Sequence, residues 1–302
     1  MRLFTRLLAT CLALGLLAAP ATAIPEPLEV HQTPVRRLAD TLDHERPMPG
    51  LVAQVAAHFL GTPYGAQGWN ATYGVACDWN AFDCVTLVES SLALARVAAE
   101  GRASQAAYAQ ELLDLRYRDG RKQDFASRLH YFTDWIRDNE RRGRVRDITA
   151  ELGGERDTRE IHYMTRHWDQ YQKVKVEADF VAMRVVERAL TDAERYVLPK
   201  ARVKDVLDRL ESGDIIAMAT NIEGLDVVHT GLVYRKPDGA VHLLHAPVPG
   251  DVVSVSTKPL VDYLKVFDAH VGVVVARPLK PVRPWWQALT SWDSLASWIR
   301  WR

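Results

Sequence analysis

The chain has few cysteines, no excess of either charge and only one long apolar run. Its 302 residues include three cysteines, and 38 basic residues balance 38 acidic ones. Three cysteines cannot form the set of disulfides that holds small secreted domains together. The balanced charge gives no electrostatic reason to expect a nucleic-acid partner. We therefore expect a fold held by an apolar core, in one large domain or two small ones.

The single long apolar run lies at the N-terminus. Arg2 and Arg6 precede an apolar stretch from Leu7 to Ala19, and the small residues Ala21-Thr22-Ala23 follow it. This order is typical of a secretory signal peptide, and the stretch is too short to form a stable membrane anchor. We expect residues 1–23 to be removed and the mature protein to be exported to the periplasm. Their removal leaves 36 basic residues against 38 acidic ones.

Two cysteines remain after this removal, Cys77 and Cys84. Cys84 follows Asp83, a good helix N-cap, and precedes an apolar run typical of a largely buried helix. The unpaired N–H groups and the positive dipole end of a first helical turn favour a thiolate, so Cys84 is our candidate nucleophile. Two alternatives stay open. Cys84 could be a packed core residue, or it could form a disulfide with Cys77 in an oxidising compartment.

Composition divides the first two thirds of the chain into three parts. Residues 24–50 form an N-terminal extension that contains prolines and a short helical pattern near Val35 to Leu42. In residues 51–100, a helix from Leu51 to Leu60 is followed by a loop rich in glycine and tryptophan, suited to a cleft wall, and then by the Cys84 helix. Residues 101–210 are predicted to be mainly helical, as an insertion or a small subdomain.

Three segments of this helical part have helical patterns: Ser104 to about Arg118, Phe125 to Ile136, and Asp192 to Leu210. In the second segment, Arg128 and Tyr131 lie on a different helical face from the apolar residues. We propose these two side chains as substrate-binding residues, on a helical wall of a groove. The alternative is that Arg128, His130 and Tyr131 only tie helices together.

Residues 211–280 have the pattern of an antiparallel sheet. Runs rich in β-branched residues alternate with turn residues: Ile215 to Thr220, Val227 to Tyr234, Ala240 to His245, Val252 to Ser256, and Val271 to Arg277. The turn Lys236-Pro237-Asp238-Gly239 joins the second run to the third. We therefore predict an α+β protein in which the helix that carries Cys84 packs with an antiparallel sheet or half-barrel.

Two histidines of this sheet can complete a cysteine site. His229 lies near the start of the second run and His245 near the end of the third, and antiparallel pairing places such positions side by side. A thiol nucleophile needs a base that a third polar group orients. We assign His229 as general base and then acid, and His245 as the residue that orients it. No cluster of ligand residues has metal-binding spacing, so neither a metal nor another cofactor is predicted.

Several motifs, in a fixed order, carry a resemblance to a known superfamily. They are Leu60-Gly61-Thr62-Pro63-Tyr64, Phe82-Asp83-Cys84, Ser212-Gly213-Asp214-Ile215-Ile216, His229-Thr230-Gly231-Leu232 and His245-Ala246. This set resembles the NlpC-type, papain-like cell-wall cysteine hydrolases. The segments Ser127 to Ile136 and Thr220 to Asp226 resemble its N-acetylmuramoyl-L-alanine amidase-like branch, long catalogued as a domain of unknown function. The resemblance covers residues 51–278.

The resemblance implies a papain-like core with an added helical part and a Cys84-His229-His245 site. The implied reaction is hydrolysis of the amide between the lactyl group of N-acetylmuramic acid and L-alanine, in peptidoglycan or its fragments. Tyr64, in the first motif, joins Arg128 as a substrate-binding candidate. A stem-peptide endopeptidase of the same superfamily, or a peptidoglycan-binding protein without catalysis, are the alternatives.

The sequence departs from the superfamily at two places. The usual second aromatic residue and paired glycines are missing after Tyr64, and Val85-Thr86 replaces a Ser-Gly pair after Cys84. These positions would supply subsites and oxyanion contacts. The backbone N–H of Cys84, at the helix start, is the oxyanion donor that carries over first.

The chain ends in a tryptophan-rich segment, residues 281–302. On a helix, apolar side chains of this segment form one stripe: Trp285, Leu289, Trp292, Leu295, Ala296 and Ile299. We favour a helix docked on its own domain. The alternative is a peripheral contact with a membrane or a glycan, because tryptophans with flanking arginines suit interfaces.

Overall fold

The structure is a computed structural model, and it describes residues 33–171 and 176–282. The predicted signal peptide and the tail from Arg283 lie outside the described residues. The α-helices are α1 (Pro34–Ala39), α2 (Met48–His58), α3 (Cys84–Ala99), α4 (Gln105–Arg116), α5 (Phe132–Arg141), α6 (Tyr163–Arg166), α7 (Glu177–Thr191) and α8 (Leu260–Leu264). The 3-10 helices are η1 (Arg118–Gly120), η2 (Trp168–Tyr171) and η3 (Lys200–Arg209).

Within the described residues, an eight-stranded sheet runs in the order β4-β5-β10-β6-β7-β8-β9, and β3 pairs with β10. Its strands are β3 (Val145–Asp147), β4 (Glu155–Arg156), β5 (Tyr196–Pro199), β6 (Ile215–Thr220), β7 (Val227–Arg235), β8 (Val241–His245), β9 (Ser254–Val255) and β10 (His270–Pro278). The strands β1 (Trp69–Asn70) and β2 (Val75–Ala76) form a separate pair. All strand pairs are antiparallel, which confirms the predicted α+β class with an antiparallel sheet.

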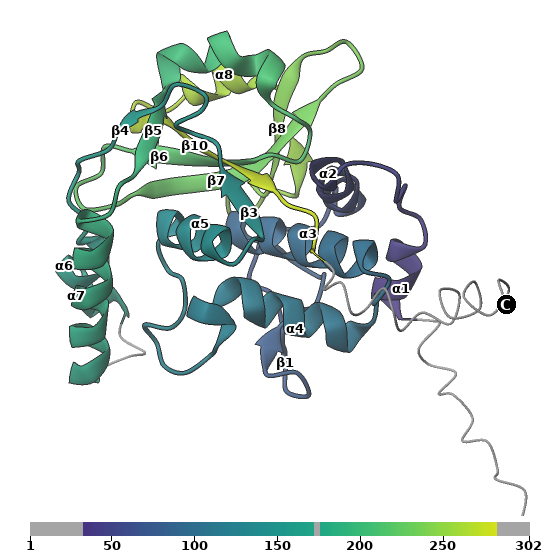
Figure 1. Cartoon of the computed structure of the whole chain (residues 1–302), viewed down its shortest axis with the longest axis horizontal. Helices are drawn as coiled ribbons and strands as arrows, with labels where there is room; N and C mark the ends of the chain where they lie inside the picture. Colours follow the sequence, from purple (N-terminus) through teal and green to yellow (C-terminus); the bar gives the residue numbers. More distant parts are fainter. Residues whose placement is uncertain (1–32, 172–175, 283–302) are drawn as a thin grey trace, which may run out of the picture.

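The sheet lies between two layers (Figure 1). Helices α2, α3 and α5 cover one face, and α8 and η3 cover the other. Alternate residues of β6 face the two sides, since Ile215 and Ala217 join the core around α3, whereas Ile216 and Met218 join the core under α8. Because both faces are covered, every residue of β6 is buried.

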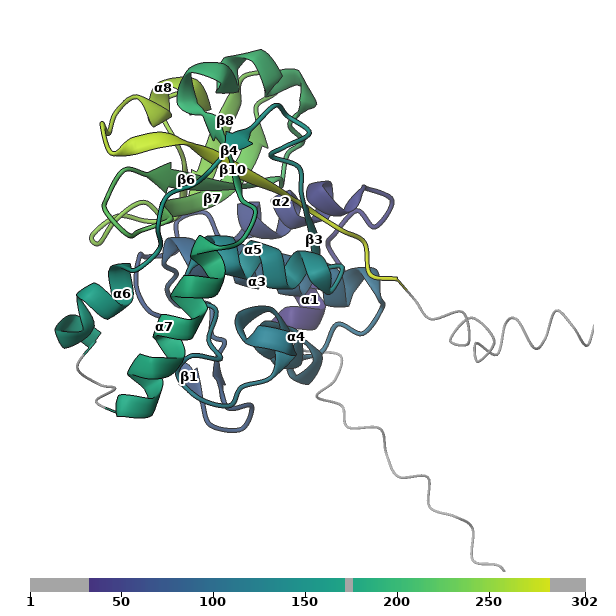
Figure 2. The same ribbon diagram turned by 60° about the vertical axis from the view of Figure 1, so that its left-hand side comes forward.

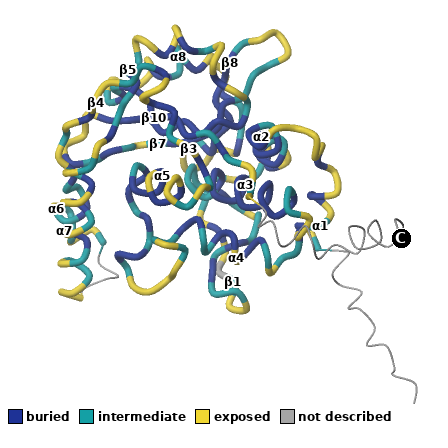
Figure 3. Tube along the Cα trace, in the orientation of Figure 1, coloured by how far each residue is buried: buried dark blue, intermediate teal, exposed yellow. Residues whose placement is uncertain are grey.

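Helix α3 is the centre of the larger core. Its residues from Leu87 to Ala98 are all buried, and the trace of α3 is dark along most of its length in Figure 3. The helix packs against α2, α4 and β7. A helix that is apolar on several faces needs such a central place, as the sequence pattern indicated. Its first turn, with Cys84, lines a cavity.

The predicted helical part, residues 101–210, does more than add helices. It supplies β3, β4 and β5 to the same sheet, and α4 and α5 pack in the core around α3. Helices α6 and α7 lie to one side of this core in both views (Figures 1 and 2). The prediction of a helix from Asp192 to Leu210 was wrong, because Tyr196–Pro199 pairs with β4 and β10, and Lys200–Arg209 forms the 3-10 helix η3. Strand pairing with distant residues overrides a local helical pattern.

The prediction of one helix from Phe125 to Ile136 was also wrong, since α5 begins at Phe132. The Ser127 hydroxyl accepts hydrogen bonds from two preceding N–H groups, and Asp124 accepts one from the Ser127 N–H (2.7 Å). These bonds offer the backbone an alternative to the helix. Arg128 and Tyr131 therefore lie in a loop before α5 and share no helix face.

Candidate functional site

Cys84 is the first residue of α3, and a capping box fixes its place. Asp83 accepts a hydrogen bond from the Thr86 N–H (2.7 Å), and the Thr86 hydroxyl accepts one from the Asp83 N–H (2.9 Å). This confirms the predicted N-cap.

Cys84 is half-buried and Cys77 is fully buried, and both are free thiols in the structure. The alternative of a Cys77–Cys84 disulfide is therefore not what this structure contains.

The two predicted histidines lie side by side at one end of the hairpin β7–β8. Nε2 of His229 is 2.8 Å from Nδ1 of His245, and the two rings meet edge to face with centroids 5.1 Å apart. The pairing of Leu232 with Leu244 sets the register that brings them together. Gly231, between His229 and Leu232, permits the close approach. A side chain there would place its Cβ 2.9 Å from His245 Cβ.

Gly231→Ala is expected to displace His245 and to lower activity. The added methyl would also meet the Leu244 carbonyl oxygen at 2.9 Å, so the strand β8 must shift rather than one flexible side chain. We expect a fall in kcat of about 100-fold, since small misplacements of a catalytic group have effects of that order. Gly50→Ala is the control, because the three atoms nearest to its added Cβ all belong to the Arg46 side chain and lie 3.3 Å or more away. An unchanged kcat in Gly231→Ala would contradict the expectation.

Cys84 and His229 both line one cavity of about 250 Å³. Three segments line it: residues 83–85, residues 128–130 with Phe132, and residues 225–230. The backbone N–H of Thr230, next to His229, lies close enough to the Cys84 sulfur to act on the pKa of the thiol. The start of α3 and the first half of β7 therefore meet at this cavity, although Cys84 and His229 are 145 positions apart in the sequence.

The comparison with protein families found one family whose model covers both the Cys84 helix and the strands with the histidines. A family model described as AmiA-like, N-acetylmuramoyl-L-alanine amidase-like, matches residues 54–273, which include Cys84, His229 and His245. The chain belongs to this AmiA-like family. The comparison with curated proteins gave no match.

Solved structures resemble the AmiA-like chain over most of its length. An N-acetylmuramoyl-L-alanine amidase from Bacteroides uniformis matches it with a TM-score of 0.71 and 32% identity, over 77% of this chain and 99% of that one. A Bacteroides fragilis protein provisionally described as a xylanase matches with a TM-score of 0.67 and 35% identity, over 74% and 99%. A Legionella pneumophila protein has a TM-score of 0.59 at 21% identity, over 82% and 95%, which shows the fold alone.

Burial controls the protonation state of the AmiA-like cysteine. Burial and the nearby Asp83 carboxylate raise the pKa of Cys84 to about 11, although the N–H groups of Thr230, Val85 and Cys84 itself act in the opposite direction. The expectation that the helix start holds a thiolate was therefore wrong for the free protein. Loss of hydration outweighs the effect of the helix N–H groups.

Burial has the opposite effect on the two histidines, because it disfavours their charged forms. Burial and the neighbouring His245 lower the pKa of His229 to about 3, and burial lowers the pKa of His245 to about 4. At neutral pH the resting site therefore holds a thiol and two neutral imidazole rings. A neutral His229 is in the form that a general base requires.

Alkylation of Cys84 by iodoacetamide is expected to accelerate steadily with pH. Because the pKa of Cys84 is raised to about 11, the thiolate fraction and the rate should grow about tenfold per pH unit from about pH 6 to 9. The measurement needs the mature chain with Cys77→Ala, so that Cys84 is the only thiol. A rate that stays constant over this range would indicate a preformed thiolate–imidazolium pair instead.

Arg128 lines the cavity, and its guanidinium group is paired with the buried carboxylate of Glu89. Its Nη1 donates to Glu89 Oε1 (2.9 Å) and to the Arg116 carbonyl oxygen (3.0 Å). The Arg116 Nε donates to the other Glu89 oxygen (2.6 Å). Glu89 lies on α3, five positions after Cys84, and is fully buried. The same helix thus places the cysteine and, through Glu89, the guanidinium group of Arg128.

The two predicted tyrosines have different positions. Tyr64 is half-buried, and burial raises its pKa with further contributions from Cys84 and Asp83, so its side chain lies near the start of α3. Tyr131 is 2% exposed, and its hydroxyl donates to Glu187 (2.7 Å) and accepts from the Met164 N–H (2.8 Å). This position does not fit the substrate-binding role predicted for Tyr131, because the hydroxyl is already paired inside a separate small core.

The sequence assigned no role to two residues near the site, Asp226 and Tyr263, and it considered His130 together with Arg128 and Tyr131. Asp226 and His130 line the cavity, and Tyr263 of α8 lies edge to face against His245. Asp226 is fully paired, since it accepts from the Thr133 N–H and hydroxyl (both 2.8 Å) and from the Val227 N–H (2.7 Å). Its position directly before the second run was the available signal. Tyr263 had none, because α8 reaches His245 only through tertiary packing.

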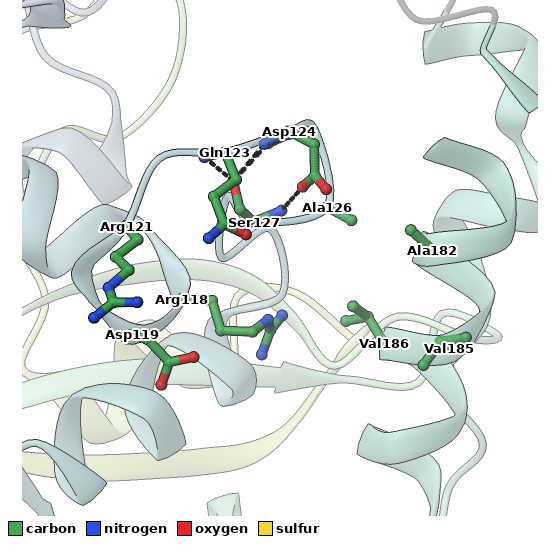
Figure 4. A pocket seen from close by; sticks show the side chains of 10 residues that line it. All are labelled: Arg118, Asp119, Arg121, Gln123, Asp124, Ala126, Ser127, Ala182, Val185 and Val186. Atoms are coloured by element: carbon green, nitrogen blue, oxygen red, sulfur yellow. Dashed lines mark hydrogen bonds between the residues drawn. The ribbon is translucent and has the colours of Figure 1, made fainter. Parts of the chain in front are cut away.

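A larger cavity, of about 610 Å³, lies between the loop after α4 and helix α7 (Figure 4). Arg118 and Arg121 approach it from one side, and Ala182, Val185 and Val186 approach from α7. None of the predicted site residues lines it. In the described residues, no helix is long and apolar enough to span a membrane, and no group of three or more ligand residues is placed to hold a metal ion.

Proposed function

We propose that the protein is a cysteine amidase that hydrolyses the bond between N-acetylmuramic acid and L-alanine in peptidoglycan or its fragments. One observation carries the proposal: Cys84 and the paired His229 line one cavity in a chain of an amidase-like family. The Bacteroides uniformis neighbour, which carries the name of this activity, supports the choice of bond. The motif resemblance supports a papain-like, NlpC-type core for the fold.

The hydrogen bond between the histidines supports the direction of proton transfer. When His229 carries its proton on Nε2 and donates it to Nδ1 of His245, Nδ1 of His229 has a free lone pair. This nitrogen takes the proton of the Cys84 thiol as the sulfur attacks the amide carbonyl carbon. Since the pKa of Cys84 is raised to about 11, proton transfer accompanies the attack and does not precede it.

The remaining steps return every group to its first state. The tetrahedral oxyanion forms next to the start of α3, where the Cys84 backbone N–H is the proposed donor. As the carbon–nitrogen bond breaks, His229 gives its proton to the amine of the L-alanyl peptide. A water molecule then attacks the thioester and gives a proton to His229, and the Cys84 sulfur leaves and takes that proton back.

Arg128 and Tyr64 are the proposed substrate-binding residues. Nη1 of Arg128 is occupied by Glu89 and Arg116, so its other N–H groups are available to a carbonyl or carboxylate of the substrate. Peptidoglycan stem peptides carry carboxylates, which suits a guanidinium group. The hydroxyl of Tyr64, kept protonated by its raised pKa, is a second donor near Cys84.

The proposal also includes a place in the cell. The N-terminal pattern of residues 1–23 favours export, so the mature protein would start near Ile24 and act in the periplasm, where peptidoglycan lies. The catalytic parts would be residues 51–100 and 211–280, with residues 24–50 and 101–210 around them. Residues 281–302 remain a proposed contact with the chain's own domain or with a membrane surface.

Product analysis on defined muropeptides tests the proposed function. The mature protein is incubated with N-acetylmuramoyl peptides that carry a reducing or an anhydro sugar, and with intact sacculi, and the products are identified by mass spectrometry. A free peptide with an L-alanine N-terminus together with a peptide-free sugar supports the amidase. Cleavage inside the stem would indicate the endopeptidase, and binding without products would indicate a non-catalytic protein.

A further inference from the structure

Helix α8 brings an aromatic ring to the histidine pair. The ring of Tyr263 meets the ring of His245 at 86°, with centroids 5.1 Å apart, and His245 in turn bonds to His229. Edge-to-face contacts of this kind are favourable because the positive edge of one ring meets the negative face of the other. Tyr263, His245 and His229 thus form a continuous row of three rings, of which the last lines the cavity with Cys84.

The hydrogen bond to His229 does not fix the ring of His245 completely. It holds Nδ1 of His245 at 2.8 Å from His229, but the ring can still tilt within the range of angles that a hydrogen bond tolerates. A ring packed against His245 from another side removes this freedom. Tyr263 is the ring that the structure places there.

The position of Tyr263 is itself fixed from several directions. Leu260 and Leu264, on either side of it in α8, are completely buried in the core beneath the sheet. The Tyr263 N–H donates to the Pro259 carbonyl oxygen (2.8 Å) at the start of the helix. Helix α8 also packs against η3 and β8, which ties it to the sheet. The short helix therefore holds its tyrosine firmly.

We propose that Tyr263 is a positioning residue of the active site, whose ring holds His245 in the plane from which His245 orients His229. This inference rests on the proposed function, because it gives His245 the orienting role. Burial and the nearby Cys84 raise the pKa of Tyr263, which supports a place close to the reacting sulfur. The contact with His245 that the structure shows is one between the two rings, at an interplanar angle of 86°.

Two substitutions at position 263 separate the ring from the hydroxyl. Tyr263→Leu keeps apolar bulk but has no ring, so kcat should fall at least about tenfold, as for other residues that orient a catalytic group, while KM changes little. Tyr263→Phe keeps the ring and should retain kcat within about twofold. Tyr196→Leu, on the distant strand β5, is the control for loss of a tyrosine and should retain full activity.

Thermal unfolding of each variant shows whether it is folded, and Tyr263→Met replaces the leucine variant if that one is not. A kcat near that of the wild type in the folded Leu or Met variant would overturn the inference. An equal loss in Tyr263→Phe would also overturn it, since the hydroxyl would then be the active part. Failure of the proposed function is a different result, in which the wild-type protein releases no product from any muropeptide.

Discussion

Cys84→Ala is expected to abolish turnover and to leave thermal stability nearly unchanged. The substitution removes the only group in the cavity able to form the thioester, so kcat should fall by at least about 10⁴-fold, as in other enzymes that lose their nucleophile. Cys84 is half-buried at the end of a helix whose cap, Asp83 and Thr86, stays in place. The free energy of unfolding should therefore change by less than about 1 kcal/mol.

Release of L-alanyl peptide from muropeptides, followed by mass spectrometry, measures this loss. Cys77→Ala is the matched control, because Cys77 lies in the main core and does not line the cavity. It should keep the activity and lose some stability. If Cys84→Ala still releases the peptide at the wild-type rate, the cysteine mechanism is wrong.

Glu89→Ala is expected to have the largest effect on stability. Glu89 is completely buried and is paired with Arg116 and Arg128 through both carboxylate oxygens. Removing one partner of a buried ion pair leaves uncompensated charge inside the protein, which costs about 3–5 kcal/mol. In Glu89→Ala the guanidinium groups of Arg116 and Arg128 would both lose this partner, and Arg128 lines the cavity. Activity should therefore fall together with stability.

Urea unfolding of the variant and the wild type measures the difference. Asp40→Ala is the control, because Asp40 pairs with Arg36 on the surface, where such a pair contributes about 1 kcal/mol or less. Similar losses in the two variants would contradict a special role for the buried network.

The same network predicts how stability depends on pH. Burial alone would raise the pKa of Glu89, but Arg128 and Arg116 lower it below its ordinary value. A carboxylate whose folded pKa is lowered stabilises the protein above its unfolded pKa, and this contribution is lost as the pH falls below that value. The wild type should lose stability in acid more steeply than Glu89→Ala.

Local patterns were sufficient for the parts of the site that depend on neighbouring residues. Asp83 and Thr86 start α3 at Cys84 by bonds within one turn, so the sequence showed where the helix begins. The hairpin of β7 and β8 follows from the alternation of side chains along the two strands and from the four-residue turn between them. The sequence therefore also showed that His229 and His245 could be neighbours. The ordered motifs identified the family.

Other features depend on contacts between distant segments, and these the sequence did not reveal. Tyr131 has the same local pattern as Arg128, yet Glu187 and Met164 draw it into a separate core while Glu89 holds Arg128 at the cavity. Residues 192–210 look helical, but pairing with β4 and β10 makes part of them a strand.

The sequence by itself determined which residues start the Cys84 helix and which strands carry the histidines, because caps, turns and alternation act over a few residues. The tertiary structure decided the charge on the sulfur and which other side chains surround it. Burial of Cys84 depends on β7, a strand that lies far along the chain, and it reversed the expected ionisation. Desolvation is a property of the assembled fold, and no local pattern encodes it.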